Sequence, residues 1–408
     1  MKFIFCSSIY NMVDYDKLSK KSKISLSLAD HNLNYNIILG LDEALNTQIN
    51  LINNVQIPTY PKFPKIMFRK QVWSHSKNES DDINCGFINL PLIKHLSRAI
   101  TTFFAIKQKI KEYKEETICL LTYDLHMGIS LAIKLIKFLY PKVCTCAVLP
   151  DIPNALLTVS SGGSITFKDK IKAAIKTSFI KQFDSYVFIT EYMKDIVDVK
   201  NKSYTVVEGI YNNNQPLLTQ EKNDKKIILY TGQLNPAYGM ENLLDAFIDI
   251  YQEHKDYELW ICGGGKLSQY IKDLALTCKG IKYLGYCGPE KIKECQMNST
   301  VLINPRQNTG EFTKYSFPSK TMEYLASGKP VVGYKLSGIP TEYDKYINYV
   351  EDDSIEALKN KLIEICSMSL TKRNEIGEKS RKFILENKNP KKQCDKIVNM
   401  VKILVKDK

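Results

Sequence analysis

The sequence predicts an α/β protein with two doubly wound domains that face each other across a cleft. Its length of 408 residues fits two domains, each large enough for its own hydrophobic core. Short apolar runs alternate with longer amphipathic stretches along the whole chain, and this pattern is typical of parallel sheets joined by crossover helices. The alternation pauses once, at a polar segment, and then starts again.

That polar segment sets the expected domain boundaries. Residues 211–226 contain three consecutive Asn, a Pro and charges of both signs, which is typical of a linker. We therefore expect a first domain over 1–210 and a second domain over 227–385. A basic C-terminal helix over 386–408 can pack back on the first domain.

The first domain begins with an apolar run that is too short for the core of a signal peptide, so we interpret it as a strand. Further short apolar runs predict the other strands, and two longer stretches have helical apolar spacing. The expected strands are Lys2–Cys6, Asn36–Leu39, Ile118–Thr122, Cys144–Leu149 and Tyr186–Ile189, and the expected helices are Leu92–Lys111 and Gly128–Leu139.

The second domain repeats the pattern in units of about 25 to 30 residues, as βα repeats require. In such sheets ligands bind beyond the carboxyl ends of the strands. The expected strands are Ile227–Thr231, Glu258–Cys262, Ile281–Leu284, Val301–Ile303 and Pro330–Gly333, and the expected helices are Met240–Tyr251, Leu267–Thr277, Pro289–Gln296, Ser319–Ala326, Ser354–Ser367 and a last helical segment over 374–408.

The composition is basic, because 57 Lys and Arg against 44 Asp and Glu give a formal net charge of +13. Such an excess favours an anionic partner, which could be nucleic acid, a membrane surface or a phosphorylated substrate. The 11 Cys form no CxxC pair, which argues against a disulfide framework and a zinc site. No stretch approaches the ~18 apolar residues of a membrane span, so we expect a cytoplasmic protein.

The most informative motif is FPSKTMEYLASGKPVV, residues 317–332. Ser319 begins a helix whose free backbone N–H groups attract a phosphate, and Lys320 adds a cation at the same end. Glu323 lies one turn further on and can accept hydrogen bonds from vicinal hydroxyls. This arrangement suits a nucleotide.

The motif resembles the donor-binding segment of the family 4 glycosyltransferases of bacterial surface polysaccharide synthesis, which are retaining enzymes of the GT-B fold. The family pattern is E-x7-E, and Glu323 matches its second Glu, which implies a ribose contact and a place in the active site. Tyr315 stands where the family has its first Glu. The resemblance implies a nucleotide-sugar donor, UDP- or GDP-linked, and no bound metal or other cofactor.

A second stretch, LYTGQLNPAYGMENLLDAF at residues 229–247, resembles the family's GRLxxxKGxxxLLxAF. The Arg and Lys that neutralise the donor diphosphate in the family are replaced here by Gln233 and Tyr238. We expect Lys320 and the Gly232 turn to take over this role. Arg306 and Lys314 are further candidates for contacts with the donor. We also expect Gln233 to contact the donor.

Three glycines close the strand in WICGGG, residues 260–265, where backbone can approach a ligand. Alone, such a cluster is more often a plain turn, but Gly263 and Gly264 fall between the two stronger motifs. Tyr286 follows the next strand, where the family lines its base pocket. We therefore count these three residues among the donor contacts.

The first domain resembles the family mainly in its strand order. Asp151 follows the strand Cys144–Leu149 and could hydrogen-bond a sugar or stabilise positive charge at the anomeric carbon. His126 follows the strand Ile118–Thr122. We regard both as candidate catalytic residues, and the alternatives are a turn-capping Asp and a structural His.

The sequence thus predicts a glycosyltransferase that moves a sugar from a nucleotide donor to a hydroxyl of a glycan or lipid-linked glycan. A sugar-nucleotide epimerase of the same fold and a non-catalytic, degenerate transferase subunit remain as alternatives. No RNA-binding aromatic motif or helix-turn-helix signature supports a nucleic-acid partner.

Two Lys-rich stretches, residues 100–114 and 167–181, are amphipathic. Such helices can bind an anionic membrane surface, which would make the protein peripheral on the inner face of the cell membrane. They can equally face the core and expose their Lys to solvent.

Overall fold

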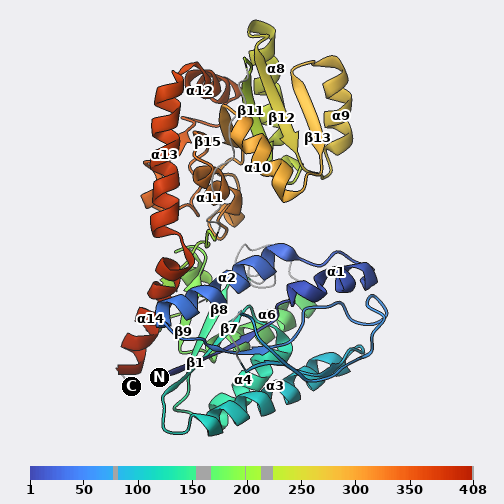
Figure 1. Ribbon diagram of the computed structural model, residues 1–408, viewed down its shortest axis with the longest axis vertical. Helices are drawn as coiled ribbons and strands as arrows, with labels where there is room; N and C mark the ends of the chain where they lie inside the picture. Colours follow the sequence, from blue (N-terminus) through green and yellow to red (C-terminus); the bar gives the residue numbers. More distant parts are fainter. Residues whose placement is uncertain (77–80, 153–166, 198, 213–223, 407–408) are drawn as a thin grey trace. The chain divides into compact units, whose positions relative to one another are not determined.

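The computed structural model describes residues 1–76, 81–152, 167–197, 199–212 and 224–406. The chain divides into two compact units, one formed by Met1–Ile210 with Pro390–Lys408 and the other by Tyr211–Asn389 (Figure 1). Most of the linker predicted over 211–226 lies outside the described residues. Each unit contains its own sheet and its own core.

The first unit contains an eight-stranded sheet within its described residues, with the strand order β10-β9-β8-β7-β1-β2-β5-β4. Neighbouring strands are parallel except for the edge pair β4 and β5, and a separate antiparallel pair joins β3 and β6. The strands are β1 Lys2–Ser7, β2 Asn50–Asn53, β3 Met67–Phe68, β4 Gln71–Trp73, β5 Asp82–Asn84, β6 Phe87–Ile88, β7 Ile118–Tyr123, β8 Cys144–Leu149, β9 Ser185–Phe188 and β10 Ser203–Val206.

One expected strand of this unit is wrong. Residues 36–39 lie within a helix, which begins after the N-cap Ser27 and ends at Asn46 in the left-handed conformation. The apolar run is buried because the helix packs between the sheet and the last helix of the chain, not because it is a strand. The helices are α1 Met12–Lys21, α2 Leu28–Leu45, α3 Ile93–Glu112, α4 Met127–Leu139, α6 Phe167–Lys181, α7 Met193–Val197 and α14 Pro390–Lys406.

A buried charge cluster joins α2 to the edge of this sheet. The ring of His75 lies between two carboxylates, with Nδ1 2.6 Å from Asp82 Oδ2 and Nε2 2.8 Å from Asp42 Oδ2. Burial by itself lowers the pKa of His75, but the hydrogen bonds to Asp42 and Asp82 outweigh this and raise the pKa to about 9. His75 is therefore a cation at neutral pH.

The second unit has an all-parallel sheet with the order β13-β12-β11-β14-β15-β16. The chain moves outward from β11 to β13 and then returns to β14 on the other side of β11. The strand order therefore reverses between β11 and β14, which is where doubly wound sheets bind ligands. The strands are β11 Lys226–Thr231, β12 Tyr257–Cys262, β13 Ile281–Gly285, β14 Val301–Asn304, β15 Val331–Gly333 and β16 Asn348–Tyr349.

The helices of the second unit follow the predicted order. The last helical segment is split at Lys388 and Asn389, because Pro390 disfavours helical conformation in the residue before it. None of the helices within the described ranges is long and apolar enough to cross a membrane. The helices are α8 Met240–Glu253, α9 Ser268–Thr277, α10 Pro289–Asn298, α11 Ser319–Ala326, α12 Ile355–Ser367 and α13 Leu370–Asn387.

Candidate functional site

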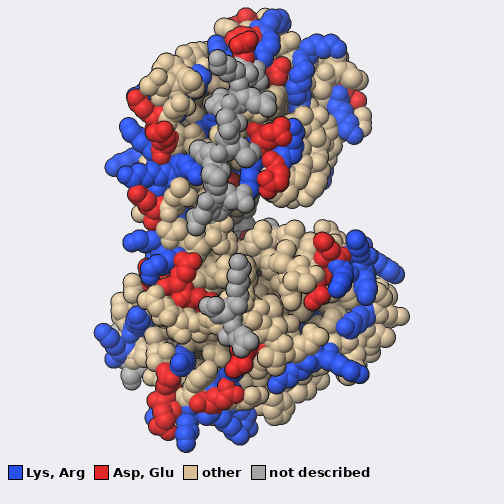
Figure 2. Space-filling model, viewed as in Figure 1, with Lys and Arg blue, Asp and Glu red and all other residues tan. Residues whose placement is uncertain are grey.

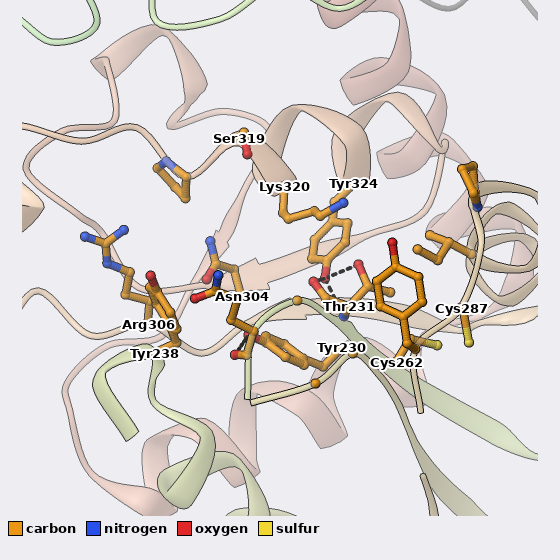
Figure 3. Close-up of a pocket in the computed structure, with 18 of the residues that line it drawn as sticks. Tyr230, Thr231, Tyr238, Cys262, Cys287, Asn304, Arg306, Ser319, Lys320 and Tyr324 are labelled. Atoms are coloured by element: carbon orange, nitrogen blue, oxygen red, sulfur yellow. Dashed lines mark hydrogen bonds between the residues drawn. The ribbon is translucent and has the colours of Figure 1, made fainter. Parts of the chain in front are cut away.

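A cavity of about 630 Å³ lies in the second unit, where β11, β12 and β14 end and α11 begins. Figure 3 shows Arg306 and Tyr238 at one end and Cys262 and Cys287 at the other, with Lys320 and Tyr324 between them. The lining consists of Tyr230, Thr231, Gly232, Gln233, Tyr238, Cys262, Gly263, Gly264, Tyr286, Cys287, Pro289, Ile292, Asn304, Arg306, Phe317, Pro318, Ser319, Lys320 and Tyr324.

Glycine backbone forms one wall of this cavity, which we call the donor pocket because the sequence predicts a nucleotide-sugar donor there. Gly263 has φ +143°, and a Cβ there would lie 1.8 Å from the carbonyl oxygen of Gly232. The two turns are also hydrogen-bonded, because Gly232 N donates to Cys262 O at 3.0 Å. Only glycine at position 263 allows this close approach, which leaves bare backbone facing the cavity.

The amino end of α11 forms the opposite wall. Pro318 precedes the helix and provides no side-chain cap for the first backbone N–H groups, and Pro318, Ser319 and Lys320 all line the cavity. Tyr324 fixes the helix in place: its buried hydroxyl accepts from Thr231 N at 2.8 Å and donates to Thr231 O at 3.0 Å. A helix amino end held in this way attracts anions.

Two cations accompany this helix end. Lys320 lines the cavity, and its Nζ lies 2.7 Å from Glu323 Oε2. Arg306 is only 7% exposed and donates to Ser316 Oγ at 2.9 Å. Burial lowers the pKa of Arg306, and its buried Nε has no hydrogen-bond partner among the described residues. A desolvated guanidinium beside a cavity favours an anionic ligand.

The far end of the pocket is more apolar. Cys287, Pro289 and Ile292 line it, and Tyr286 stands 91% exposed at its rim. Tyr283 braces the loop behind it by donating to Gly263 O at 2.9 Å. The pocket therefore offers an anion site at one end and an apolar lining at the other, a combination that suits a nucleotide.

The structure brings most of the predicted donor residues together. Eight line the pocket: Gly232, Gln233, Gly263, Gly264, Tyr286, Arg306, Ser319 and Lys320. Three do not. Lys314 pairs with Glu311 at 2.9 Å, Glu323 contacts the pocket's Lys320, and Tyr315 lies outside the lining.

Sequence reasoning missed several lining residues. Thr231 and Asn304 are the last residues of β11 and β14, so the rule that ligands bind at strand ends could have found them. Tyr238 also lines the cavity, whereas the sequence predicts it only as the replacement for a family Lys. No sequence pattern predicts the role of Tyr324, because that role depends on which face of α11 packs against β11.

Comparison with known proteins also relates the second unit to glycosyltransferases. Residues 217–383 match the family model described as glycosyl transferases group 1. An uncharacterized glycosyltransferase of Methanocaldococcus jannaschii, MJ1178, is 24% identical over 254 residues, which cover 60% of this chain and 68% of that protein. The protein is a glycosyltransferase.

Solved structures agree on the fold of this glycosyltransferase. The lipopolysaccharide outer core galactosyltransferase WaaB in its apo form aligns with a TM-score of 0.60 and 14% identity, over 99% of both chains. Sucrose-phosphate synthase from Thermosynechococcus elongatus aligns with a TM-score of 0.59 and 13% identity, over 100% of both chains. The GT-B fold and the enzyme class that the sequence predicts are confirmed.

Of the three candidate catalytic residues, Glu323 lies on α11 of the second unit, and Asp151 and His126 lie in the first unit, after neighbouring strands. Asp151 follows β8, and His126 immediately precedes α4, with Nδ1 3.9 Å from Asp124 Oδ2. Asp124, which the sequence reasoning passed over, has φ +59°, a conformation that is uncommon outside glycine and clusters at functional sites.

The neighbouring carboxylates around Asp151 shift its pKa. Burial raises the pKa of Asp151, and the nearby Asp30 and Asp124 raise it further. Burial lowers the pKa of His126, although Asp124 opposes the shift. Across the described ranges, no group of three His, Cys, Asp or Glu is placed to hold a metal ion. This part of the first unit therefore combines concentrated negative charge with an imidazole whose neutral form is favoured.

Proposed function

We propose that this glycosyltransferase binds a UDP- or GDP-linked sugar in the donor pocket and transfers the sugar, with retention, to a glycan or lipid-linked glycan hydroxyl. The observation that carries the proposal is the convergence of an uncapped helix amino end, Lys320 and the desolvated Arg306 at the switch point of the sheet. These groups suit a diphosphate, which leaves with a growing negative charge during transfer.

Each part of the pocket has a proposed partner on the donor. The α11 amino end and Lys320 take the diphosphate, and Glu323, held by Lys320, takes the ribose hydroxyls. Tyr286 and the apolar end around Ile292 take the base. Tyr315 and Lys314 remain proposed donor contacts from the family resemblance, although both lie outside the lining.

For the first unit we propose that Asp151 and His126 act on the sugar and on the acceptor hydroxyl. Asp124 and Asp151 follow strands β7 and β8, and Asp30 lies in the first turn of α2; together these three neighbouring carboxylates favour positive charge nearby. Such a field would stabilise the charge that develops at the anomeric carbon when the glycosidic bond to the diphosphate breaks.

Calorimetry tests the donor site directly. We expect one of UDP, GDP and ADP to bind the wild-type protein, and Lys320→Gln to weaken its binding by about tenfold. Lys335→Gln is the matched control, because this lysine is exposed and pairs with Asp344 outside the pocket. Absence of binding of all three nucleotides would refute the donor site. A panel of nucleotide sugars, assayed for hydrolysis without acceptor, then identifies the sugar.

We also propose that the outer face of α3 and α4 binds an anionic membrane. The two helices pack side by side (Figure 1). Phe104 of α3 is 61% exposed and Phe138 of α4 is 83% exposed, and Lys107 and Lys134 flank them in sequence. On the viewed face, basic and acidic groups are interspersed over both units (Figure 2). Apolar side chains flanked by cations suit a lipid surface with negative headgroups.

Vesicle co-sedimentation tests the membrane proposal. We expect the protein to bind vesicles that contain anionic lipid and not neutral ones, and Phe104→Ser with Phe138→Ser to lose the binding. Leu276→Ser is the control, because Leu276 is also highly exposed but lies on α9 of the second unit. Equal binding by the double variant and the wild type would contradict the assignment of this face.

A further inference from the structure

A second cavity lies in the same unit, at the opposite edge of the sheet from the donor pocket. It has a volume of about 220 Å³ and adjoins the starts of β11, β14 and β15, the end of α12 and the first turns of α13. Strand β11 runs from Lys226 at this cavity to Thr231 at the donor pocket. At ~3.3 Å per residue the two cavities are separated by roughly 17 Å of strand.

The distal cavity is basic and polar. Its lining includes four cations, Lys225, Lys226, Lys329 and Arg373, against one carboxylate, Asp224, and Lys226 also pairs at 3.4 Å with Asp256 outside the lining. Hydroxyl and amide side chains, among them Thr300 and Asn374, complete the polar lining. A cavity with this balance of charge favours an anion, and its volume accommodates a phosphate with a small organic group attached.

Backbone packing holds the two innermost cations together. Gly377 of α13 contacts the turn before β15 so closely that a Cβ there would lie 1.8 Å from Gly328 O. Arg373 precedes Gly377 by four residues and therefore lies on the same face of the helix. Lys329 directly follows Gly328. Both side chains line the cavity, and Arg373 lies close enough to influence the charge of Lys329.

Two neighbouring cations repel each other, and a bound anion would reduce this repulsion. Lys329 is only 7% exposed, and its burial, together with the nearby Arg373, lowers the pKa of the ammonium to about 8. Arg373 donates to Cys366 O and Met368 O at the end of α12, so its position is fixed. The amino end of α13 also lies at the cavity through Leu370, and its dipole adds to the positive potential.

We propose that the distal cavity binds a phosphate group, supplied either as inorganic phosphate or as a small phosphate monoester. The phosphate oxygens accept hydrogen bonds from Lys329 and Arg373, and the hydroxyl and amide side chains of the lining complete the site. This site is separate from the donor pocket and does not depend on the function proposed for it.

Calorimetry with inorganic phosphate and with glucose 1-phosphate tests this site and distinguishes the two sources. We expect at least one to bind the wild-type protein, and Lys329→Gln to weaken that binding by about tenfold. Asn374→Asp changes an exposed residue of the lining and should weaken binding by repulsion without disturbing the core. It therefore decides the question if Lys329→Gln does not fold.

Two controls separate this site from other cations. Lys345→Gln removes the same charge from an exposed position outside both cavities and should leave phosphate binding unchanged. Lys320→Gln perturbs the donor pocket and should also leave it unchanged. The proposal is overturned if neither ligand binds the wild-type protein. It is also overturned if binding is lost in Lys320→Gln but kept in Lys329→Gln or Asn374→Asp.

Discussion

Removing one hydroxyl, in Tyr324→Phe, should destabilise the second unit measurably. The side chain of Tyr324 is 1% exposed, and its hydroxyl contacts three atoms of Thr231: the backbone N at 2.8 Å, Oγ1 at 3.0 Å and the backbone O at 3.0 Å. The substitution keeps the ring and its packing. The change in stability therefore reports on the hydrogen bonds alone.

The expected magnitude follows from the burial of Thr231, which is 2% exposed. Without the hydroxyl, its backbone N–H loses its partner in a region closed to water. A buried polar group left in this state costs about 1–3 kcal/mol, more than the ~1 kcal/mol net value of an ordinary hydrogen bond. We therefore expect the free energy of unfolding of the second unit to fall by about 1–3 kcal/mol.

Urea denaturation measured by tryptophan fluorescence provides the assay. The chain has two Trp, Trp73 in the first unit and Trp260 in the second, so a Trp73→Phe background reports the second unit alone. Tyr270→Phe is the matched control, because the side chain of Tyr270 is half exposed on α9. If Tyr324→Phe costs no more than this control, the hydroxyl does not anchor α11 and the reasoning fails.

Two other predictions concern the backbone of the donor pocket and the charge cluster of the first unit. Gly263→Ala should destabilise the protein by at least about 2 kcal/mol, because the new Cβ would collide with backbone at a residue of positive φ. Gly264→Ala should be nearly neutral, because its Cβ meets nothing within 4 Å. Melting temperatures of the two variants and of the wild-type protein test both expectations. His75 has a pKa of about 9 in the folded protein, above its ordinary ~6.5, so its contribution to stability is full below pH 6.5 and is lost as the pH rises through 9. Between pH 6.5 and pH 9, the free energy of unfolding of the wild-type protein, measured in urea, should fall by about 3 kcal/mol relative to that of His75→Gln, which lacks this titration. If the free energies of unfolding of the two proteins change with pH in parallel, the buried ion pairs of His75 with Asp42 and Asp82 are contradicted.

The second unit was the easier half to predict, because its strands are short, apolar and bounded by clear turn residues. The segments Ile227–Thr231 and Glu258–Cys262 match β11 and β12 to within a residue. Eight predicted donor residues line one cavity because the carboxyl ends of parallel strands lie at one edge of a sheet. This placement needs only the strand order, which the alternating pattern indicates.

The first unit shows where the pattern is ambiguous. An apolar run such as residues 36–39 is expected both in a buried strand and in a helix that packs against other elements on two sides. One of the elements that bury α2 is α14, which lies more than 340 residues further along the chain. Periodicity describes local exposure alone. The true second strand, β2, has only four residues and gave no separate signal.

The sequence by itself determined the alternating α/β architecture, the two domains and the glycine and helix-start motifs of the donor pocket, because each depends on neighbouring residues along the chain. Only the tertiary structure decided which side chains meet. It placed Tyr324 against Thr231, and Lys329 with Arg373 in a second cavity. These contacts join residues on different strands and helices, and their distances depend on how the elements pack, which no local pattern encodes.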